Sequence, residues 1–352
     1  MNNRIWYAIG VMSGTSLDGV DICYVRFDYD GKYNFEILCA DTITYPENWK
    51  LTLKNAFTSN YDLLKDLDVE YGTYLGGLIN HFIDEHSISN VDFIASHGHT
   101  IFHNPTESYT LQIGNGHTIA DITQLKVICD FRTQDIKFGG QGAPLVPIGD
   151  ELLFDDYDYC LNLGGFVNIS FKHNSERIAF DICPVNIVLN HYVNKLGLAF
   201  DDKGQIASSG KINIELFERL NELDFYHKSP PKSLGLEWVL DFVNPLIDSY
   251  NLDVNDIIRT FIEHVAYQIS NVIKKNSTIL ITGGGAFNNY LMERIEFYLE
   301  QEISVAETQL IDFKEALIFA FLGLLRIENQ VNCLQSVTGA SKDHCSGVIF
   351  AP

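Results

Sequence analysis

The chain has 352 residues, of which 46% are hydrophobic and 20% charged, which is the balance of a globular protein long enough for two domains. Its formal net charge of −22 repels nucleic acids and anionic membranes, so we expect neither as a partner. The seven cysteines show no C-x-x-C spacing, and the N-terminus shows no basic segment followed by an apolar core. We therefore expect reduced thiols, no signal peptide and a cytoplasmic location.

The first part of the chain predicts an antiparallel meander followed by a helix. β-rich apolar runs predict strands at 5–12, 20–27 and 35–43, and the short turns between them favour antiparallel pairing. Apolar residues at helical spacing predict a helix over 62–86. A short strand at 91–95 is expected to lead into Ser96-His-Gly-His-Thr.

The same order of elements recurs past the middle of the chain. Strands are predicted at 159–163, 166–171 and 177–181, with a glycine turn after the first, and a helix follows at 184–196. The repetition predicts a duplicated unit with a cleft between the two copies.

The last third is predicted to be rich in helices. Asp253 is a candidate N-cap for a long amphipathic helix, and a buried strand at 278–282 precedes a further helix. A final helix is expected at 313–326. We predict the seam between two domains in the segment 132–147.

Three glycine-rich turns follow predicted strands, and we number them in chain order. The first covers residues 14–19, the second 164–165 and the third 283–285. Successive backbone N–H groups in such turns form anion sites, and the carboxylate of Asp18 is a type of ligand that Mg²⁺ prefers. A plain hairpin explains the first turn equally well. Three turns at strand ends, without a Walker A motif, together favour a nucleotide site of another class.

Ten segments, spread in order along almost the whole chain, share a resemblance. They are 9–21, 96–100, 111–114, 130–132, 139–147, 161–168, 230–233, 283–288, 314–317 and 337–340. Together they resemble the anhydro-N-acetylmuramic acid kinase family. The resemblance implies an α/β fold of the sugar kinase/heat-shock-chaperone/actin superfamily, with two duplicated actin-like (ribonuclease-H-like) domains, mixed sheets flanked by helices, and a central cleft. We place the domains at 1–131 and 132–352, with the C-terminal segment able to pack back on the first.

The resemblance also implies the reaction. In this family, ATP and water convert 1,6-anhydro-N-acetylmuramic acid to N-acetylmuramic acid 6-phosphate, with Mg²⁺ as cofactor, in peptidoglycan recycling. The small amino sugar is the expected partner, and the family suggests a homodimer. The expected ATP-binding residues are those of the glycine turns and their neighbours: Gly14, Thr15, Ser16, Leu17, Asp18, Gly19, Val20, Asp21, Gly164, Gly165, Asn168, Gly283, Gly284, Gly285 and Asn288.

Three charged residues are candidates for contact with the sugar. Asp181, at the end of an apolar strand, matches the family's catalytic base, although a helix cap is the alternative. Arg132 is assigned to the lactyl carboxylate of the substrate through a bidentate pair, and a surface ion pair is its alternative. Glu315 is assigned to a sugar hydroxyl or the water, and a solvated helix face explains it almost as well.

Two histidines, His97 and His99, lie two residues apart after a predicted strand, with His103 nearby. Alternation along an extended segment predicts that the first two share one face. Because no third ligand stands at metal spacing, we prefer a role for His97 in hydrogen bonding to substrate or loop over a metal site.

A few positions depart from the family's pattern, and they bear on which sugar is accepted. They are Ile182, Cys183, Val185, His99, Leu234 and Leu236. Two alternatives therefore remain beside the ring-opening kinase. One is a kinase for another amino sugar that needs no ring opening, and the other is a non-catalytic nucleotide sensor of the same fold.

Overall fold

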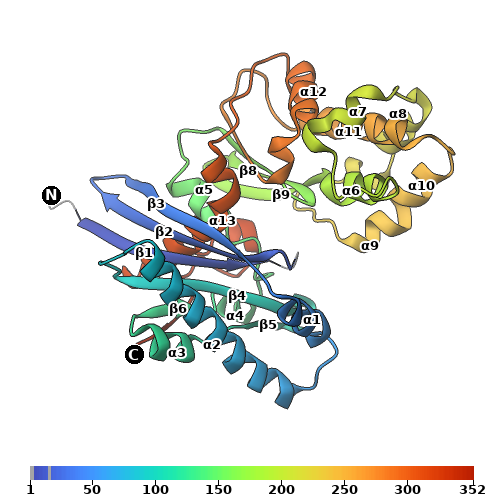
Figure 1. The fold of residues 1–352 in the computed structure, drawn as a ribbon. Coiled ribbons are helices and arrows are strands. Elements are labelled where there is room, and N and C mark those ends of the chain that lie inside the picture. Colours follow the sequence, from blue (N-terminus) through green and yellow to red (C-terminus); the bar gives the residue numbers. More distant parts are fainter. Residues whose placement is uncertain (1–3, 15–16) are drawn as a thin grey trace. The chain divides into compact units, whose positions relative to one another are not determined.

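The computed structural model describes residues 4–14 and 17–352, and these form two compact units (Figure 1). Unit 1 comprises Met1–Leu153 and Phe313–Pro352, and unit 2 comprises Phe154–Asp312. The boundary therefore lies after Leu153 and not after residue 131 as the sequence analysis placed it. The reason is that the segment 132–147 bonds within unit 1: the Asp135 carboxylate, for example, accepts a hydrogen bond from His344. The return of the C-terminal segment was among the expected arrangements.

Unit 1 is built on a seven-stranded mixed sheet with the order β11-β6-β4-β1-β2-β3, in which β5 pairs with β4. Its strands are β1 (Arg4–Ser13), β2 (Gly19–Tyr29), β3 (Tyr33–Thr44), β4 (Phe93–Asn104), β5 (Tyr109–Ile113), β6 (Val127–Cys129) and β11 (Val348–Phe350). Its helices are α1 (Glu47–Ala56), α2 (Tyr61–Glu85), η1 (Pro105–Glu107), α3 (Gly116–Thr123), α4 (Thr133–Lys137), α5 (Pro147–Leu152), α13 (Thr308–Ile327, in unit 1 from Phe313 on) and α14 (Gln335–Thr338).

The two faces of strand β1 pack against different helices. Ile9 and Val11 belong to the apolar cluster that α2 completes, as the helical spacing at 62–86 predicted. Gly10 faces α13, so closely that a Cβ at this position would lie 2.8 Å from the carbonyl carbon of Ala316 and closer still to its oxygen. Strand alternation thus places α2 and α13 on opposite faces of the sheet.

Unit 2 contains a four-stranded sheet with the order β10-β7-β8-β9. Its strands are β7 (Tyr159–Leu163), β8 (Phe166–His173), β9 (Glu176–Pro184) and β10 (Ile279–Thr282). Its helices are α6 (Asn186–Asn194), η2 (Asp202–Gly204), α7 (Gln205–Ser209), α8 (Ile214–Asn221), η3 (Asp224–His227), α9 (Leu236–Trp238), η4 (Val239–Val243), α10 (Asn244–Asp248), α11 (Val254–Ser270), η5 (Gly284–Phe287) and α12 (Asn289–Leu299). The predicted amphipathic helix is α11, and Asp253 occupies its N-cap position.

Each unit repeats the same strand connections. In unit 1, β1, β2 and β3 pair antiparallel and β1 also pairs parallel with β4. In unit 2, β7, β8 and β9 pair antiparallel and β7 also pairs parallel with β10. The predicted α/β fold class, with a duplicated unit and helix-flanked mixed sheets, is therefore confirmed. Among the described residues, no helix has the length and apolar character needed to cross a membrane.

Candidate active site

In both units the glycine turns follow the carboxyl ends of parallel strands, whereas Asp181 lies on the strand β9 and Glu315 on the helix α13. In unit 1, β1, β4 and β6 run parallel. The first glycine turn follows β1, Arg132 follows β6, and the three histidines lie within β4. In unit 2, β7 and β10 run parallel and end in the second and third glycine turns. The carboxyl ends of parallel strands are the usual place for ligands in open α/β sheets.

The first glycine turn joins β1 to β2. The Leu17 N–H donates to the Gly14 carbonyl at 3.5 Å, and Leu17 has a φ of 60°. The Asp18 side chain is exposed, so its carboxylate is accessible to a cation, whereas Val20 is buried in the core. Asp21 accepts a hydrogen bond from the Thr42 hydroxyl at 2.6 Å. Thr15 and Ser16, also expected at the nucleotide, lie outside the described residues.

The third glycine turn packs directly on the end of β7. A Cβ on Gly283, whose φ is 83°, would lie 2.8 Å from the carbonyl carbon of Leu163, and one on Gly285 would lie 2.8 Å from the Leu163 Cβ. A Cβ on Gly284 would meet no atom within 4 Å. Two glycines therefore allow the close approach of the turn, and the middle one leaves a backbone surface without a packed neighbour, as an anion site requires.

The second glycine turn is held by the start of α6. The backbone N–H groups of Val185 and Ile187 donate to the Gly165 carbonyl at 2.9 and 3.3 Å. The Asn186 side chain donates to the Leu163 carbonyl at 3.0 Å, so it ties the ends of β7 and β9 together. Asn288, the last expected nucleotide residue, is buried and caps α12 by accepting from the Leu291 N–H at 2.9 Å.

Asp181 lies on β9, opposite Asn168 of β8. The Asn168 amide donates to its Oδ1, and the backbone N–H of Leu234 donates to its Oδ2 at 2.7 Å. Burial raises the pKa of the Asp181 carboxyl, and these two hydrogen bonds partly oppose that rise. A half-buried carboxylate with fixed orientation and raised pKa is suited to accept a proton from water. It does not cap the following helix, whose N-cap residue is Val185.

The Leu234 N–H is a partner that the sequence analysis missed. It belongs to the segment after Pro230-Pro-Lys-Ser, and the Lys232 carbonyl accepts the Asp181 backbone N–H at 3.1 Å. That segment was recognised only as a matching motif. A backbone donor has no side-chain signature, so residue types alone do not reveal it.

Arg132 is held by two neighbours in unit 1. Its Nε donates to His97 Nε2 at 3.0 Å, and its Nη1 donates to the Gly142 carbonyl at 2.6 Å. Among the described residues its Nη2 has no hydrogen-bond partner. Two of the five N–H groups of the guanidinium thus fix its plane, and the outer end of the fork remains available for a carboxylate.

His97 is a neutral acceptor in this arrangement. Its Nδ1 lies 2.9 Å from the Gly98 carbonyl and must donate, so its Nε2 carries the lone pair that Arg132 needs. Burial lowers the pKa of His97 well below its usual value, and Arg132 lowers it further. The expected hydrogen-bonding role of His97 is thus directed at Arg132.

Glu315 on α13 is exposed to solvent, yet protein atoms surround its carboxyl closely enough to raise its pKa by desolvation. Its interaction with Arg132 opposes that rise. The guanidinium and this carboxyl therefore attract each other, and the assignment of Glu315 to the sugar stays a prediction.

The prediction that His97 and His99 share one face is wrong. His97 packs against Phe319 of α13, with ring centroids 4.7 Å apart, whereas His99 packs against Tyr71 of α2 at 6.2 Å. The register of β4 against β1 shifts at this point, and Gly98 has a φ of 72°. The irregularity breaks the alternation on which the prediction rested.

A buried polar network lies under the end of β1 and was not predicted. The Ser13 hydroxyl lies 2.6 Å from the Tyr45 hydroxyl, 2.8 Å from the Tyr71 hydroxyl and 3.0 Å from His99 Nδ1. The histidine is part of this network and is fully buried, and His103 instead meets Thr110 at 3.1 Å. The three histidines therefore do not converge on a metal site.

Buried histidines make stability fall in acid. Burial lowers the pKa of His99 to about 4 and that of His264 in unit 2 to about 3. Because the unfolded chain takes up protons near pH 6.5 and the folded one does not, the stabilisation is complete above that pH and declines below it. We expect each histidine to remove about 1.4 kcal/mol of unfolding free energy per pH unit below 6.5.

Urea unfolding between pH 5 and 7 measures this decline. In the His99→Gln variant, the unfolding free energy should fall less steeply with decreasing pH, by about 1.4 kcal/mol per pH unit, the contribution of one histidine. The control is His81→Gln, because His81 is exposed on α2. The same slope in the His99 variant and in the wild type would contradict the assignment.

Almost the whole chain matches one family of known proteins. A family model described as anhydro-N-acetylmuramic acid kinase matches residues 6–352. The anhydro-N-acetylmuramic acid kinase of Saccharophagus degradans is 33% identical over 368 residues, covering 98% of this chain and 98% of that protein. The enzyme of the same description from Pasteurella multocida is 34% identical over 372 residues, covering 99% and 98%.

Solved structures with a similar arrangement are more distant. The Acidaminococcus fermentans (R)-2-hydroxyglutaryl-CoA dehydratase component A is 14% identical, with a TM-score of 0.46, over 90% of this chain and 96% of that one. The gluconate kinase from Lactobacillus acidophilus is 13% identical, with a TM-score of 0.41, over 99% and 94%.

Proposed function

The chain belongs to the anhydro-N-acetylmuramic acid kinase family, and we propose that it uses ATP and water to convert 1,6-anhydro-N-acetylmuramic acid to N-acetylmuramic acid 6-phosphate. The enzyme is a kinase, and the ring opening is the specific part of the proposal. The observation that supports it most is the Asp181 carboxylate, which has a raised pKa and is held in a fixed orientation by Leu234 and Asn168.

The proposed chemistry starts with a water molecule beside Asp181. The carboxylate takes a proton from the water while the oxygen of that water bonds to C1 of the sugar. The C1–O6 bond breaks in the same step. The O6 freed in this way attacks the γ-phosphorus of ATP, and ADP leaves with the electrons of the broken P–O bond. An ordinary hexose kinase also needs a base, but that base acts on a hydroxyl and no C–O bond breaks.

Other residues of the chain would bind the two substrates. Arg132 binds the lactyl carboxylate of the sugar through the outer end of its guanidinium, and Glu315 accepts a sugar hydroxyl near it. The glycine turns fit the phosphates of ATP, because Gly283 and Gly285 allow a close packing that any Cβ would block. Mg²⁺ would neutralise phosphate charge during transfer, and Asp18 is the exposed carboxylate of the first glycine turn that is available to hold it.

The departures from the family pattern are compatible with catalysis. Ile182, Cys183 and Val185 are each at most 2% exposed and belong to the apolar core of unit 2. Leu234 meets Asp181 through its backbone N–H, which any residue other than proline supplies. His99 is fully buried under β1. These observations favour an active kinase over a nucleotide sensor.

The test is an assay with Mg-ATP and 1,6-anhydro-N-acetylmuramic acid in H₂¹⁸O. Mass spectrometry should show N-acetylmuramic acid 6-phosphate with one ¹⁸O in the sugar and none in the phosphate. Turnover of N-acetylmuramic acid but not of its anhydro form would favour the kinase without ring opening. ATP binding with no phosphorylation of either sugar would favour the sensor.

A further inference from the structure

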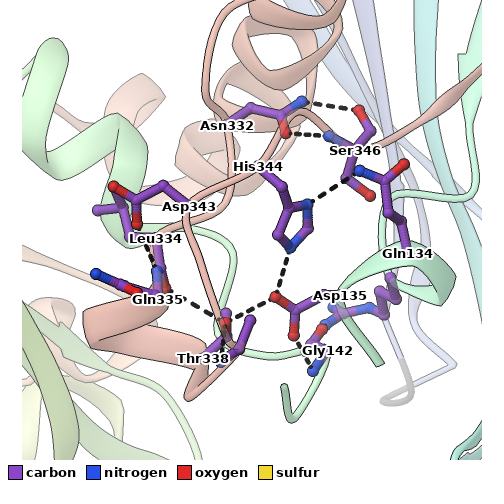
Figure 2. A network of polar contacts seen from close by, with 12 residues as sticks. Gln134, Asp135, Gly142, Asn332, Leu334, Gln335, Thr338, Asp343, His344 and Ser346 are labelled. Atoms are coloured by element: carbon purple, nitrogen blue, oxygen red, sulfur yellow. Dashed lines mark hydrogen bonds and ion pairs between the residues drawn. The ribbon is translucent and has the colours of Figure 1, made fainter. Parts of the chain in front are cut away.

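The strongest unexplained feature of unit 1 is the buried carboxylate of Asp135 on α4, shown in Figure 2. It is fully buried and receives three hydrogen bonds. Thr338 Oγ1 donates at 2.7 Å and His344 Nε2 at 2.9 Å to its Oδ1, and the Gly142 N–H donates at 2.7 Å to its Oδ2. Three donors compensate for much of the cost of burying the charge.

The protonation of His344 follows from its other neighbour. The Gln134 amide nitrogen lies 3.3 Å from His344 Nδ1 (Figure 2) and can only donate, so Nδ1 accepts and Nε2 carries the proton. Gln134 also donates to the Cys345 carbonyl at 2.9 Å. The imidazole therefore donates to Asp135 in its neutral form.

Asp135, Cys333 and His344 offer ligand atoms within 4.8 Å of one another, the one such group among the described residues. Both carboxylate oxygens of Asp135 already accept hydrogen bonds, Oδ1 from Thr338 and His344 and Oδ2 from the Gly142 N–H. The hydrogen bonds thus explain the cluster without a metal ion.

The network leads directly to Arg132 through one glycine. Asp135 fixes the N–H of Gly142, and the carbonyl of the same glycine accepts the Arg132 Nη1 at 2.6 Å. Gly142 has a φ of 68°, so its backbone must be held in the left-handed region for both bonds to form. Asp135 also attracts the guanidinium electrostatically.

The segment around Gly142 is also attached to α14. The Gln141 N–H donates to the Thr338 carbonyl at 2.8 Å, while the Thr338 side chain binds Asp135. Thr338 therefore contacts the backbone beside Gly142 and the carboxylate that holds Gly142. The C-terminal segment determines where the Gly142 carbonyl lies.

We propose that Asp135, held by Thr338 and His344, is a positioning residue that orients the Arg132 guanidinium through Gly142 for the carboxylate of the substrate. The assignment rests on the proposed function, since it takes the carboxylate-bearing sugar as the ligand of Arg132. Asp135 thus touches no substrate but controls how the lactyl carboxylate of the sugar is recognised. Ring opening and ATP binding depend on other residues.

The test compares two sugars that differ in the carboxylate. These are 1,6-anhydro-N-acetylmuramic acid and 1,6-anhydro-N-acetylglucosamine, which lacks the lactyl group. Asp135→Leu removes the acceptor of the Gly142 N–H. Asp135→Asn can keep its oxygen toward Gly142 and turn its NH₂ toward the Thr338 hydroxyl, which can accept, so only the His344 Nε2–H loses its acceptor. We expect Asp135→Leu to raise the KM for the carboxylate sugar at least 10-fold more than that for the other sugar, with the KM for ATP unchanged. The Asn variant should stay within about 3-fold of the wild type.

A second pair of variants covers the case in which Asp135→Leu does not fold. Thr338→Val removes one donor to Asp135 and Thr338→Ser keeps it, so only the Val variant should shift the ratio of the two KM values, by about 3-fold. Equal shifts for both sugars, or none, in the folded variants would overturn the positioning role while the wild-type activity stands. A wild type that phosphorylates neither sugar would refute the proposed function and this assignment together.

Discussion

Asp181→Asn is expected to lower kcat for the anhydro sugar by roughly 10³-fold, while the affinity for ATP stays within about 2-fold. The substitution removes the proton acceptor but keeps the size of the side chain. The fold should tolerate it, because one amide oxygen can accept from the Leu234 N–H and the Asn168 amide can turn its own oxygen toward the new NH₂. Single-turnover kinetics with the labelled water assay measures the chemical step, and calorimetry measures ATP binding.

The matched control is Asp158→Asn in the same unit. Asp158 is also a hydrogen-bonded carboxylate, accepting from the Thr278 N–H at 2.8 Å, but it lies just before β7, at the opposite end of that strand from the second glycine turn. Its variant should keep nearly the full kcat. If Asp181→Asn were as active as this control, Asp181 could not be the base.

Gly10→Ala should destabilise unit 1 by about 3 kcal/mol. The added methyl group would overlap the carbonyl of Ala316, so either β1 or α13 has to move. Backbone atoms cannot move aside as a flexible side chain can, which makes overpacking at this position costly. Because α13 also carries Glu315 and the Phe319 ring that packs on His97, we expect activity to fall with stability.

Gly77→Ala is the control for this prediction. Gly77 lies inside α2, and a Cβ there would meet no atom within 4 Å. Alanine at such a site should stabilise the helix by roughly 0.5–1 kcal/mol. Hydrogen exchange of peptides from β1 and α13, with α11 of unit 2 as internal reference, resolves the two effects. Unchanged protection of β1 in the Gly10 variant would contradict the close contact.

The elements predicted from periodicity are the ones that local sequence determines. The meander, α2, α11 and the four strands of unit 2 all follow from runs whose apolar spacing repeats within the segment itself. The duplicated unit could also be predicted, because the order of strands, glycine turn and helix can be recognised in both halves without sequence identity between them.

The features that were missed depend on contacts between distant residues. The hydrogen bond between Asp135 and His344 joins positions 209 apart, and the spacing of residues within α4 does not predict it. The domain boundary was misplaced for the same reason, since segment 132–147 contains the glycine and proline residues of a linker but is tied to the C-terminal segment. The register shift at Gly98 likewise depends on how β4 meets β1.

In the candidate site, the sequence predicted the side chains but not their hydrogen-bond partners. Asp181, Arg132 and His97 were found through matching motifs, and the structure gives each of them specific partners. The partners themselves are backbone groups in two cases, the Leu234 N–H and the Gly142 carbonyl, and a backbone group leaves no trace in the residue type. The roles of the three side chains in catalysis remain predictions for the experiments above.

The division of unit 1 into two stretches of chain has a consequence for biosynthesis. During translation, β1 to α5 leave the ribosome first, but the helix that packs on Gly10 is not available until residues 313–327 emerge. By then every residue of unit 2 has been synthesised, so the lobe that is begun first is completed last. The contact between β1 and α13 can therefore form only after unit 2 has been made.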